Sequence, residues 1–593
     1  MKRFTVSGMG CAACVARVEK ATNAVPGVES CSVSLLTNEM LVEGSADSAD
    51  IIKAVTDAGY GCEEEKTAET EEDESGFKDT ETPKLLKRLI VSAVLLAVQM
   101  FCMHRGWKMA EIALCVAVML INNRFFASGF KSIAHASPNM DALVAIGSLA
   151  AFAYGYYDSA AMILTFITIG KTLESYSKGR TTNALKDLVE LAPKTDIRVG
   201  DEFEVYPGDR FPVDGIILEG TAQVDESMLT GESDPVEKKA GDGICAATVN
   251  RKGTVKCRAT ATGDDTTLAR IIRLVSDTAA SKAPIARVAD KVAGVFVPCV
   301  IGIAVLVTVI WLLCGRAFGF ALERGISVLV ISCPCALGLA TPVAIMVASG
   351  RGAKNGILYK TAASIEETGR IQVVALDKTG TLTYGSKEIS DLESLEQSTE
   401  EMQIKANTLR PGAVEAVKAM KDLGLEVWMI TGDREAKARE IAASCGIDNI
   451  IWEVKPDGKS EAVAKLQTGG RKVLMVGDGI NDAPALTKAD VGLAISTGTD
   501  VAIDSADVVV MKGRLEDVVS AVRLAKATLR NIRENLFWAF LYNVIGIPVA
   551  AGMLISSGIS LTPGIAALCM SLSSFCVVMN ALRLNLVEIR PKK

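Results

Sequence analysis

The chain has 593 residues, more than one hydrophobic core usually holds, so several domains are expected. Hydrophobic residues make up 49%, which suits a chain partly embedded in lipid, and the net charge of −7 gives no sign of nucleic-acid binding. Fifteen cysteines over this length do not form a dense disulfide framework, and a reducing cytoplasm is their simpler setting. The first ten residues lack the apolar run of a signal peptide.

Residues 1–62 predict a small βαββαβ module whose first helix runs from Ala12 to about Ala24. Cys11 and Cys14 stand in a C-x-x-C spacing at the start of that helix. A helix N-terminus lowers the pKa of a thiol, so the pair can chelate a soft metal ion. A redox dithiol and half of a zinc site are the alternatives. Residues 63–83 are acidic and almost free of large apolar side chains, and we interpret them as a flexible linker.

Eight apolar runs follow, and each can form a spanning helix of about 20 residues, alone or with its flanks. They lie at 85–103, 109–122, 140–157, 159–173, 292–314, 325–349, 535–556 and 561–582. We place transmembrane helices 1–4 in residues 84–180, helices 5–6 in 284–358 and helices 7–8 in 529–586. This arrangement brings all soluble parts to one side. Lys and Arg cluster on that side, so the positive-inside rule makes it the cytoplasm. The economy of the chain favours a bacterial plasma membrane.

Two soluble inserts separate these runs. Residues 181–280 alternate strand-like segments with glycine turns and predict a small β-rich domain. Residues 359–528 alternate apolar strands with amphipathic helices and predict a doubly wound parallel α/β domain. Inside it, residues 385–408 are polar and too few to bury a core, so we interpret them as a linker with some helix.

Carboxylates follow several predicted strands of the α/β domain. Asp377 ends one strand, and other strand ends carry Asp433, Asp478 and Asp482. Ligands bind at this edge of an open parallel sheet. An Asp there can attack phosphorus and form an aspartyl phosphate, while neighbouring carboxylates hold magnesium. Strand-end caps are the alternative for any one of them alone.

Cys333 and Cys335 flank a proline in the middle of the run at 325–349. Residues i and i+2 of a regular helix face different ways, but proline removes a helical hydrogen bond and opens the turn. Both sulfurs can then point to one spot. Thiolates select soft ions such as copper(I), and two thiolates without a carboxylate suit a low charge. A proline kink with two inert cysteines is the alternative.

The last two apolar runs carry a thioether and polar groups, which are unusual inside an apolar bundle and tend to be functional. They are Tyr542, Asn543, Met570 and Ser574. Helix packing is the alternative, because Ser and Asn also link membrane helices. Silver(I) fits the same ligands as copper(I).

Four motifs, in the same order over nearly the whole chain, resemble those of P-type ATPases. They are Asp377-Lys378-Thr379-Gly380-Thr381-Leu382-Thr383, Thr431-Gly432-Asp433, Gly477-Asp478-Gly479-Ile480-Asn481-Asp482-Ala483-Pro484 and Thr230-Gly231-Glu232-Ser233. The resemblance implies an actuator domain in the β-rich insert and a haloacid-dehalogenase-like phosphorylation domain in the α/β insert.

The resemblance also assigns roles to residues. Asp377 would be phosphorylated, and Thr379 of the same motif would belong to the catalytic site. Asp478 would bind magnesium in a region that Asp482 and Asp377 also line. Thr431 and Lys459 would ligate phosphate. Glu232 would position the water that hydrolyses the aspartyl phosphate, although alone it could be an exposed turn residue.

The membrane motif resembles that of copper(I)-transporting members of the heavy-metal subfamily. Met140, Glu174 and Asp290 match the route of ion uptake and release in that subfamily, and for Glu174 and Asp290 a solvated helix end is the alternative. Ser128-Gly129 stands where the family has a glycine-pair kink that shapes a cytoplasmic platform. The N-terminal module resembles heavy-metal-associated domains, which favours copper(I) for its cysteine pair.

One part of the family pattern is missing. Relatives insert a nucleotide-binding domain of about a hundred residues after the phosphorylation motif, and the actuator insert is also shortened. A natural variant, an engineered deletion or an error in the coding sequence would each give this pattern. We expect copper(I) export with magnesium as cofactor and weak or no use of ATP. The alternatives are a non-pumping copper(I)-binding membrane protein and a phosphohydrolase-like membrane protein. Expected partners are the lipid bilayer, the copper(I) ion and a cytoplasmic copper chaperone; a monomer is expected.

Overall fold

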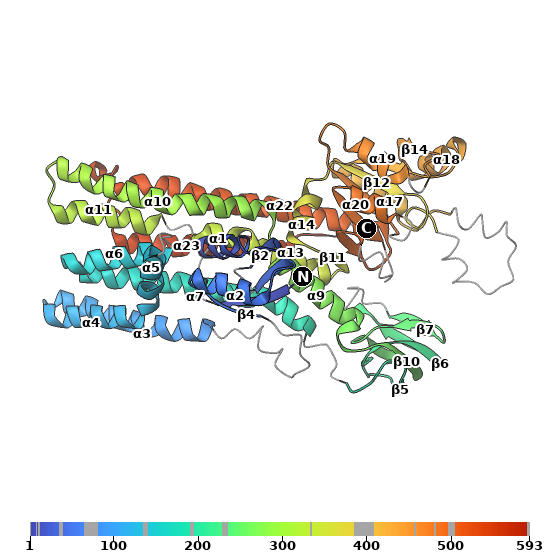
Figure 1. The fold of residues 1–593 in the computed structure, drawn as a ribbon, viewed down its shortest axis with the longest axis horizontal. Coiled ribbons are helices and arrows are strands. Elements are labelled where there is room, and N and C mark those ends of the chain that lie inside the picture. The colour runs from blue at the N-terminus through green and yellow to red at the C-terminus, as the bar shows by residue number, and fades with distance from the viewer. Residues whose placement is uncertain are drawn as a thin grey trace. The chain divides into compact units, whose positions relative to one another are not determined.

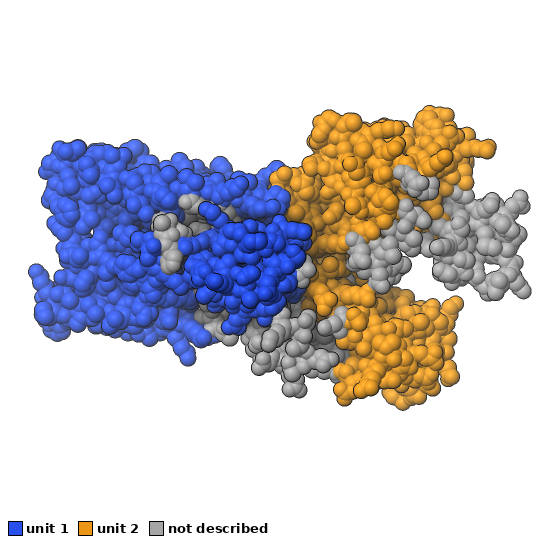
Figure 2. Space-filling view, in the orientation of Figure 1, with its two compact units in different colours: residues 1–183, 280–344, 531–583 blue, residues 184–279, 345–530, 584–593 orange. Residues whose placement is uncertain are grey.

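The computed structural model describes most of the chain. The described residues are 2–7, 9, 12–34, 39–64, 81–134, 140–189, 195–227, 235–332, 335–384, 408–455, 458–478, 482–495 and 505–589. They form two compact units, each described separately below. Unit 1 comprises residues 1–183, 280–344 and 531–583, and unit 2 comprises residues 184–279, 345–530 and 584–593 (Figure 2).

Unit 1 begins with the predicted βαββαβ module (Figure 1). Its elements are β1 (Lys2–Ser7), α1 (Ala12–Thr22), β2 (Val28–Val33), β3 (Glu39–Gly44), α2 (Ser48–Asp57) and β4 (Gly61–Glu64). The antiparallel sheet has the order β2-β3-β1-β4. Phe4, Val18 and Ile51 form part of the core between sheet and helices. The ferredoxin-like fold of this module is confirmed.

The rest of unit 1 is helical, and each predicted apolar run forms helix. The helices are α3 (Glu81–His104), α4 (Lys108–Ile121), α5 (Asn123–Ala134), α6 (Met140–Tyr154), α7 (Tyr157–Val189), α10 (Pro284–Leu313), α11 (Phe318–Ile331), α12 (Cys335–Ala340), α13 (Pro342–Ala353), α22 (Leu515–Ala551) and α23 (Pro563–Leu582), of which α13 and parts of α7 and α22 belong to unit 2. Among the described residues, four helices are long and apolar enough to cross a membrane, or five if the bent pair α4–α5 is one span. The count of eight spans stays a prediction.

The helices differ in how much of them is buried. The apolar stretch from Phe318 to Ala353 is 87% buried, against 22% for those of α3 and α10. Large apolar side chains such as Phe101, Leu313 and Trp538 are exposed on α3, α10 and α22. Exposed apolar surface of this extent indicates contact with lipid. The helix that carries the cysteine motif therefore lies inside the bundle.

Helices α4 and α5 meet at an angle of 66°. Asn122 lies at the bend, where its side-chain amide donates to Ser92 Oγ (2.9 Å) and its Oδ1 accepts from Thr168 Oγ1 (3.0 Å). The kink therefore lies at Asn122, and the prediction of Ser128-Gly129 was wrong. Gly129 has a different role, because a Cβ there would lie 2.7 Å from the backbone oxygen of Asp141, so it allows close packing of α5 on α6.

Unit 2 contains the predicted β-rich domain. Its strands are β5 (Glu202–Val205), β6 (Asp214–Asp225), β7 (Val236–Lys239), β8 (Gly243–Ile244), β9 (Val249–Lys252) and β10 (Val255–Ala261), followed by α9 (Thr267–Ala280). They pair antiparallel in the order β5-β10-β6-β7, with β8 and β9 also on β6. Phe211, Ile217 and Cys257 are fully buried in its core. The β-rich fold is confirmed.

The second part of unit 2 is the predicted doubly wound α/β domain. Its elements are β11 (Ile357–Tyr359), α14 (Ala362–Arg370), β12 (Val373–Asp377), α17 (Ala413–Asp422), β13 (Glu426–Ile430), α18 (Glu435–Cys445), β14 (Asn449–Ile451), α19 (Lys459–Leu466), β15 (Val473–Gly477), α20 (Ala483–Lys488), β16 (Val491–Ile495) and β17 (Val508–Val510). The strand order is β11-β17-β16-β15-β12-β13-β14, and only β11 runs antiparallel to its neighbour. The sheet order reverses around β12, and ligands bind at such a point.

The chain leaves and rejoins this domain at one place. Residues 385–407 lie outside the described part, and the backbone on either side is hydrogen-bonded together. The Tyr384 N–H donates to Thr408 O (3.4 Å), and the Arg410 N–H donates to Leu382 O (2.9 Å). The stretch 385–407 therefore begins and ends at the same edge of the α/β domain.

Candidate functional site

Asp377 is the last residue of β12 and projects from the reversal point of the sheet. Every residue of this strand is buried, as expected for a central parallel strand with helices on both faces. Asp377 pairs in register with Ile430 of β13, and Leu376 pairs with Val476 of β15. Its carboxylate is thus the first polar side-chain group at the end of an apolar strand, and only 4% of the residue is exposed.

Lys459 joins two carboxylates at this edge. It is the first residue of α19, and its Nζ lies 2.7 Å from Asp377 Oδ1 and 2.6 Å from Asp482 Oδ1. All three side chains are almost completely buried. The same sequence motifs contain two buried oxygen atoms, Asp482 Oδ2 and Thr381 Oγ1, that have no hydrogen-bond partner among the described residues. Unpaired buried acceptors are costly and mark a position where a ligand completes the network.

The electrostatics of this cluster are dominated by burial. Burial and the neighbouring Asp482 raise the pKa of Asp377 to about 7, while Lys459 opposes the increase. Burial by itself would lower the pKa of Lys459, but Asp377 and Asp482 raise it overall. The edge therefore concentrates more negative charge than a single lysine neutralises, and a further cation would be stabilised here.

The loop after β13 meets the loop after β12 at the same edge of the sheet. Lys378 Nζ lies 2.8 Å from Asp433 Oδ2, and the Asp433 N–H donates to Thr431 Oγ1 (3.1 Å). This ion pair links the loop after β12 to the loop after β13. Thr431 is buried, whereas Thr379 is exposed and its backbone bridges to Thr383.

Two glycines let the carboxylates approach the backbone. Gly380 has φ +77°, and a Cβ there would lie 3.3 Å from Asp478 Oδ2. A Cβ on Gly477 would lie 2.3 Å from Asp482 Oδ2. The structure therefore brings Asp377, Asp478 and Asp482 to one edge of the sheet.

Magnesium fits this edge. In the described part of the chain, no three His, Cys, Asp or Glu side chains converge as a complete metal-binding cluster. Magnesium does not require one, because it is commonly held by one or two carboxylates together with phosphate and water. The unpaired Asp482 Oδ2 and the Asp478 carboxylate beside Gly380 are suitable donors.

The membrane motif lies between two described helices. Helix α11 ends at Ile331, Ser332 is in a turn, and α12 begins at Cys335. Cys333 and the side chain of Cys335 lie outside the described part of the structure. Helix α22 passes close to the end of α11, since a Cβ on Gly546 would lie 2.9 Å from the Ile331 side chain.

Polar groups without good partners lie on the neighbouring helices. Tyr542 Oη and Asn543 Oδ1 on α22 are buried and have no hydrogen-bond partner in the described structure. The Cys569 thiol lies beside the Tyr542 hydroxyl, but a thiol is only a weak hydrogen-bond partner. Met570 and Ser574 on α23 are also buried, and Met570 packs in the same core cluster as Tyr542.

The remaining predicted residues have varied placements. Met140 is buried at the start of α6, and Glu174 lies on α7, 3.8 Å from the Lys171 amine. Asp290 is in α10, but its side chain lies outside the described part. Glu232 and Cys11 also lie outside it. Cys14 is buried on α1.

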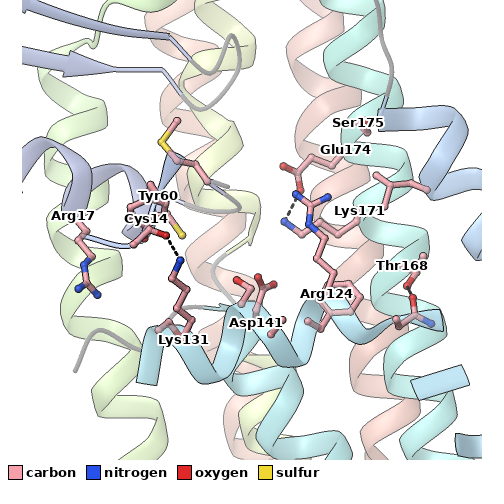
Figure 3. A pocket seen from close by; sticks show the side chains of 18 of the residues that line it. Cys14, Arg17, Tyr60, Arg124, Lys131, Asp141, Thr168, Lys171, Glu174 and Ser175 are labelled. Atoms are coloured by element: carbon pink, nitrogen blue, oxygen red, sulfur yellow. Dashed lines mark hydrogen bonds and ion pairs between the residues drawn. The ribbon is translucent and has the colours of Figure 1, made fainter. Parts of the chain in front are cut away.

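A cavity of about 330 Å³ lies between the N-terminal module and the helices of unit 1, and both Cys14 and Glu174 line it (Figure 3). Two further lining residues, Asp141 and Arg124, were not singled out from the sequence. The sequence offered only one sign of these two residues, namely that each is a charged side chain beside an apolar helix segment. Such residues are common at membrane edges.

Three families match parts of the chain. The heavy-metal-associated domain matches residues 3–61, the P-type ATPase actuator domain matches residues 177–276, and the haloacid dehalogenase-like hydrolase family matches residues 393–490. These segments include the ferredoxin-like module, the β-rich sheet and much of the α/β domain.

Curated relatives match nearly the whole chain. "Copper-transporting ATPase 1" of Rhizobium meliloti (strain 1021) is 38% identical, with 99% of this chain and 90% of the relative covered. "Copper-exporting P-type ATPase" of Staphylococcus aureus (strain JH9) is 37% identical with the same coverage. Among solved structures, a zinc-transporting PIB-type ATPase in its E2.Pi state is 26% identical with a TM-score of 0.48, over 84% of this chain and 99% of that chain.

The phosphorylation edge (the sheet edge with Asp377, Asp478 and Asp482, named after its motif), the β-rich sheet and the ferredoxin-like module are the parts of a heavy-metal-transporting P-type ATPase. The chain belongs to the P-type ATPase family, in its heavy-metal group. The alignment with the Rhizobium relative runs over 743 positions, whereas this chain has 593 residues, so at least 150 of those positions hold no residue of this chain.

Proposed function

We propose that this protein exports copper(I) from the cytoplasm through an aspartyl-phosphate cycle. The observation that carries the proposal is the pair of buried oxygens without partners, on Tyr542 and Asn543 of α22, the helix that passes close to the end of α11. A cation that binds there completes their coordination. The names of the curated relatives also support copper as the ion.

The ligand chemistry favours a soft, monovalent ion. Cys333 and Cys335 supply thiolates, Met570 supplies a thioether, and Tyr542, Asn543 and Ser574 supply neutral oxygens. Thiolate and thioether select copper(I) over harder divalent ions. None of the proposed intramembrane ligands is a carboxylate, which disfavours zinc. Silver(I) satisfies the same chemistry and remains the alternative ion.

In the proposed cycle, an Asp377 carboxylate oxygen attacks phosphorus, and the bond from phosphorus to the leaving oxygen breaks. Lys459 orients the carboxylate and neutralises the transferred group, and Thr431 donates to a phosphate oxygen. Magnesium, held by Asp478 and the Asp377–Asp482 edge, would supply further neutralisation of the phosphoryl charge. Glu232 would then orient the water that cleaves the aspartyl phosphate.

We further propose that this chain uses ATP poorly. The stretch 385–407 is too short to bury a core of its own. At least 150 positions of the alignment with the Rhizobium relative hold no residue of this chain, which supports the loss of a domain-sized segment. Without a surface for the adenine, ATP contributes mainly its phosphates to binding, so small phosphoryl donors such as acetyl phosphate should compete well with it.

Transport by purified protein in sealed vesicles tests both parts. Copper(I) uptake driven by acetyl phosphate is expected to equal or exceed uptake driven by ATP, and Asp377→Asn should abolish both. Zinc(II) should not be transported. A normal rate with micromolar ATP affinity would contradict the proposed impairment, and uptake of zinc(II) in preference to copper(I) would contradict the proposed ion.

The second candidate is a copper(I)-binding membrane protein that does not pump. The shortness of residues 385–407 favours it, because the metal ligands can persist without nucleotide use. Copper(I) binding that depends on Cys333 and Cys335, without phosphate-driven uptake, would support this candidate.

A further inference from the structure

The cavity in unit 1 has an excess of positive charge. Its walls carry five basic side chains and two acidic ones. The basic residues are Arg17, Arg88, Arg124, Lys131 and Lys171. A partly enclosed cavity concentrates the field of such charges and raises the local concentration of anions. A free copper(I) cation would therefore be repelled from the space beside the uptake residue Glu174.

The basic residues come from separate parts of the fold. Arg17 lies on α1 of the N-terminal module, Arg88 on α3, Arg124 on α5 and Lys171 on α7. Figure 3 shows Arg17 and Arg124 on different sides of the cavity, with Lys131 between them. Arginine binds carboxylates with two parallel hydrogen bonds, so separated arginines suit a ligand with separated carboxylates.

The module is attached at this cavity by polar contacts. Lys131 Nζ donates to Gly59 O (2.6 Å), and Lys282 Nζ lies 2.9 Å from Glu19 Oε1. Both side chains of the second pair are more than four-fifths buried. The second contact joins α1 to the segment just before α10, the first joins the loop after α2 to α5, and Cys14 of α1 lines the cavity.

Sulfur lines one wall of the cavity. Met9 and Cys14 are both buried lining residues, while Asp141 and Glu174 belong to the helices. A thioether and a thiol are soft ligands, which bind copper(I) rather than harder ions. The cavity thus combines anion recognition with soft-metal recognition, and a simple phosphate or carboxylate would use only the first.

We propose that this cavity binds a small anionic thiol with at least two carboxylates, of tripeptide size, which carries copper(I) to the protein. Its volume of about 330 Å³ is within the range of small-molecule sites. The carboxylates bind the arginines, and the thiol faces Cys14. In the exchange, a Cu–S bond to Cys14 forms as the Cu–S bond to the carrier breaks, and the departing thiolate takes up the proton that Cys14 releases. The carrier role rests on the proposed copper function, whereas binding of the thiol does not.

Calorimetric titration of the full chain in phosphatidylcholine nanodiscs tests the site, with copper-free reduced glutathione as the probe. The double variant Arg88→Ala/Arg124→Ala should weaken binding by about tenfold or more, because charge-assisted hydrogen bonds are lost. Lys84→Ala/Lys87→Ala is the matched control, since it removes the same charge from exposed positions near Arg88. It should leave binding unchanged.

Two further arms separate the possible ligands. S-methylglutathione keeps both carboxylates but has no free thiol, so it should bind the cavity and slow the loading of Cys14 from copper(I)–glutathione in a Cys333→Ser/Cys335→Ser background. Absence of saturable glutathione binding, or equal weakening by both double variants, would overturn the proposal. Loss of glutathione binding when phosphatidylglycerol is added to the nanodisc would assign the cavity to a lipid headgroup instead. Neither result depends on transport, so they leave the proposed function to its own test.

Discussion

The phosphorylation edge in unit 2 and the proposed copper site in unit 1 satisfy their polar groups in different ways. At the edge, charged groups have charged partners: Lys459 lies within 2.7 Å of Asp377 and 2.6 Å of Asp482. In the helix bundle, Tyr542 Oη and Asn543 Oδ1 are neutral and have no partner among the described residues. The first site already has an ion-pair network before its ligand arrives, although Asp482 Oδ2 still lacks a partner there, whereas the two neutral oxygens of the second site depend on the ligand for theirs.

The difference follows from the surroundings. A soluble domain can hold several charges because burial is partial and ion pairs compensate for it. Inside an apolar bundle an unpaired charge is far more costly than an unpaired neutral oxygen. Neutral oxygen and thioether ligands, with the two cysteines protonated as thiols, therefore let the bundle remain stable while the ion is absent, which the proposed transport requires in every cycle. The predictions below test this contrast from the larger effect to the smaller.

Asp377→Asn should reduce phosphorylation by about three orders of magnitude or more, since removing a nucleophile eliminates the covalent step. Labelling with radioactive inorganic phosphate measures this without any need for nucleotide. Asp490→Asn is the control, because Asp490 pairs with Lys472 (2.8 Å) at the opposite end of the sheet. Equal labelling of Asp377→Asn and the unaltered protein would exclude Asp377 as the acceptor.

Lys459→Met should destabilise the α/β domain by about 3 kcal/mol, because two buried carboxylates lose their cation. Thermal unfolding of the full chain checks this. Adding Asp377→Asn to Lys459→Met should recover part of the loss, since one of the repelling charges is gone. If the double variant were as unstable as Lys459→Met alone, the carboxylate repulsion would not be the cause.

The stability of the α/β domain should depend on pH through Asp377. Its pKa of about 7 in the folded protein is above the value of about 3.9 in an unfolded chain, so the folded state binds more protons between these values. The contribution to stability is complete below pH ~3.9 and is lost as pH rises through about 7. Asp377→Asn should flatten the curve of the free energy of unfolding over that window. An unchanged slope would show that another group titrates there.

Of these substitutions, Tyr542→Phe should change the stability of the metal-free protein least. It should stabilise the fold but weaken copper(I) binding. Removing a buried hydroxyl without a good partner should stabilise the metal-free protein by about 1 kcal/mol. Loss of the proposed oxygen ligand should weaken copper(I) binding by about tenfold. Tyr157→Phe is the matched control in α7. Tighter copper(I) binding by Tyr542→Phe would contradict the proposed role of the hydroxyl.

The sequence alone predicted the helices and strands that follow from hydrophobic periodicity and from the order of the motifs. The apolar strand VVALD placed Asp377 at the end of a buried strand, and the apolar run at 561–582 predicted helix α23. Both signals are local. They depend on the residues of one segment and on rules that hold in any fold.

Contacts between residues that are far apart in the sequence could not be predicted in the same way. The kink at Asn122 depends on Ser92 and Thr168, which are distant in sequence, so glycine at position 129 gave a misleading local signal. Family likeness implied that Lys459 would ligate phosphate, whereas its bridge to Asp377 and Asp482 became visible only in the fold. The charged cavity combines residues from the N-terminal module and four helices (α3, α5, α6 and α7), a combination that no single segment could indicate.

Copper(I) binding to the full chain with Cys11→Ser and Cys14→Ser tests the central claim most directly, because these changes leave only the proposed site in the bundle. Titration against a copper(I)-specific chelator should show retained tight binding in this variant, and further substitution of Cys333→Ser and Cys335→Ser should abolish it. Binding that survives the loss of both Cys333 and Cys335 would contradict the account.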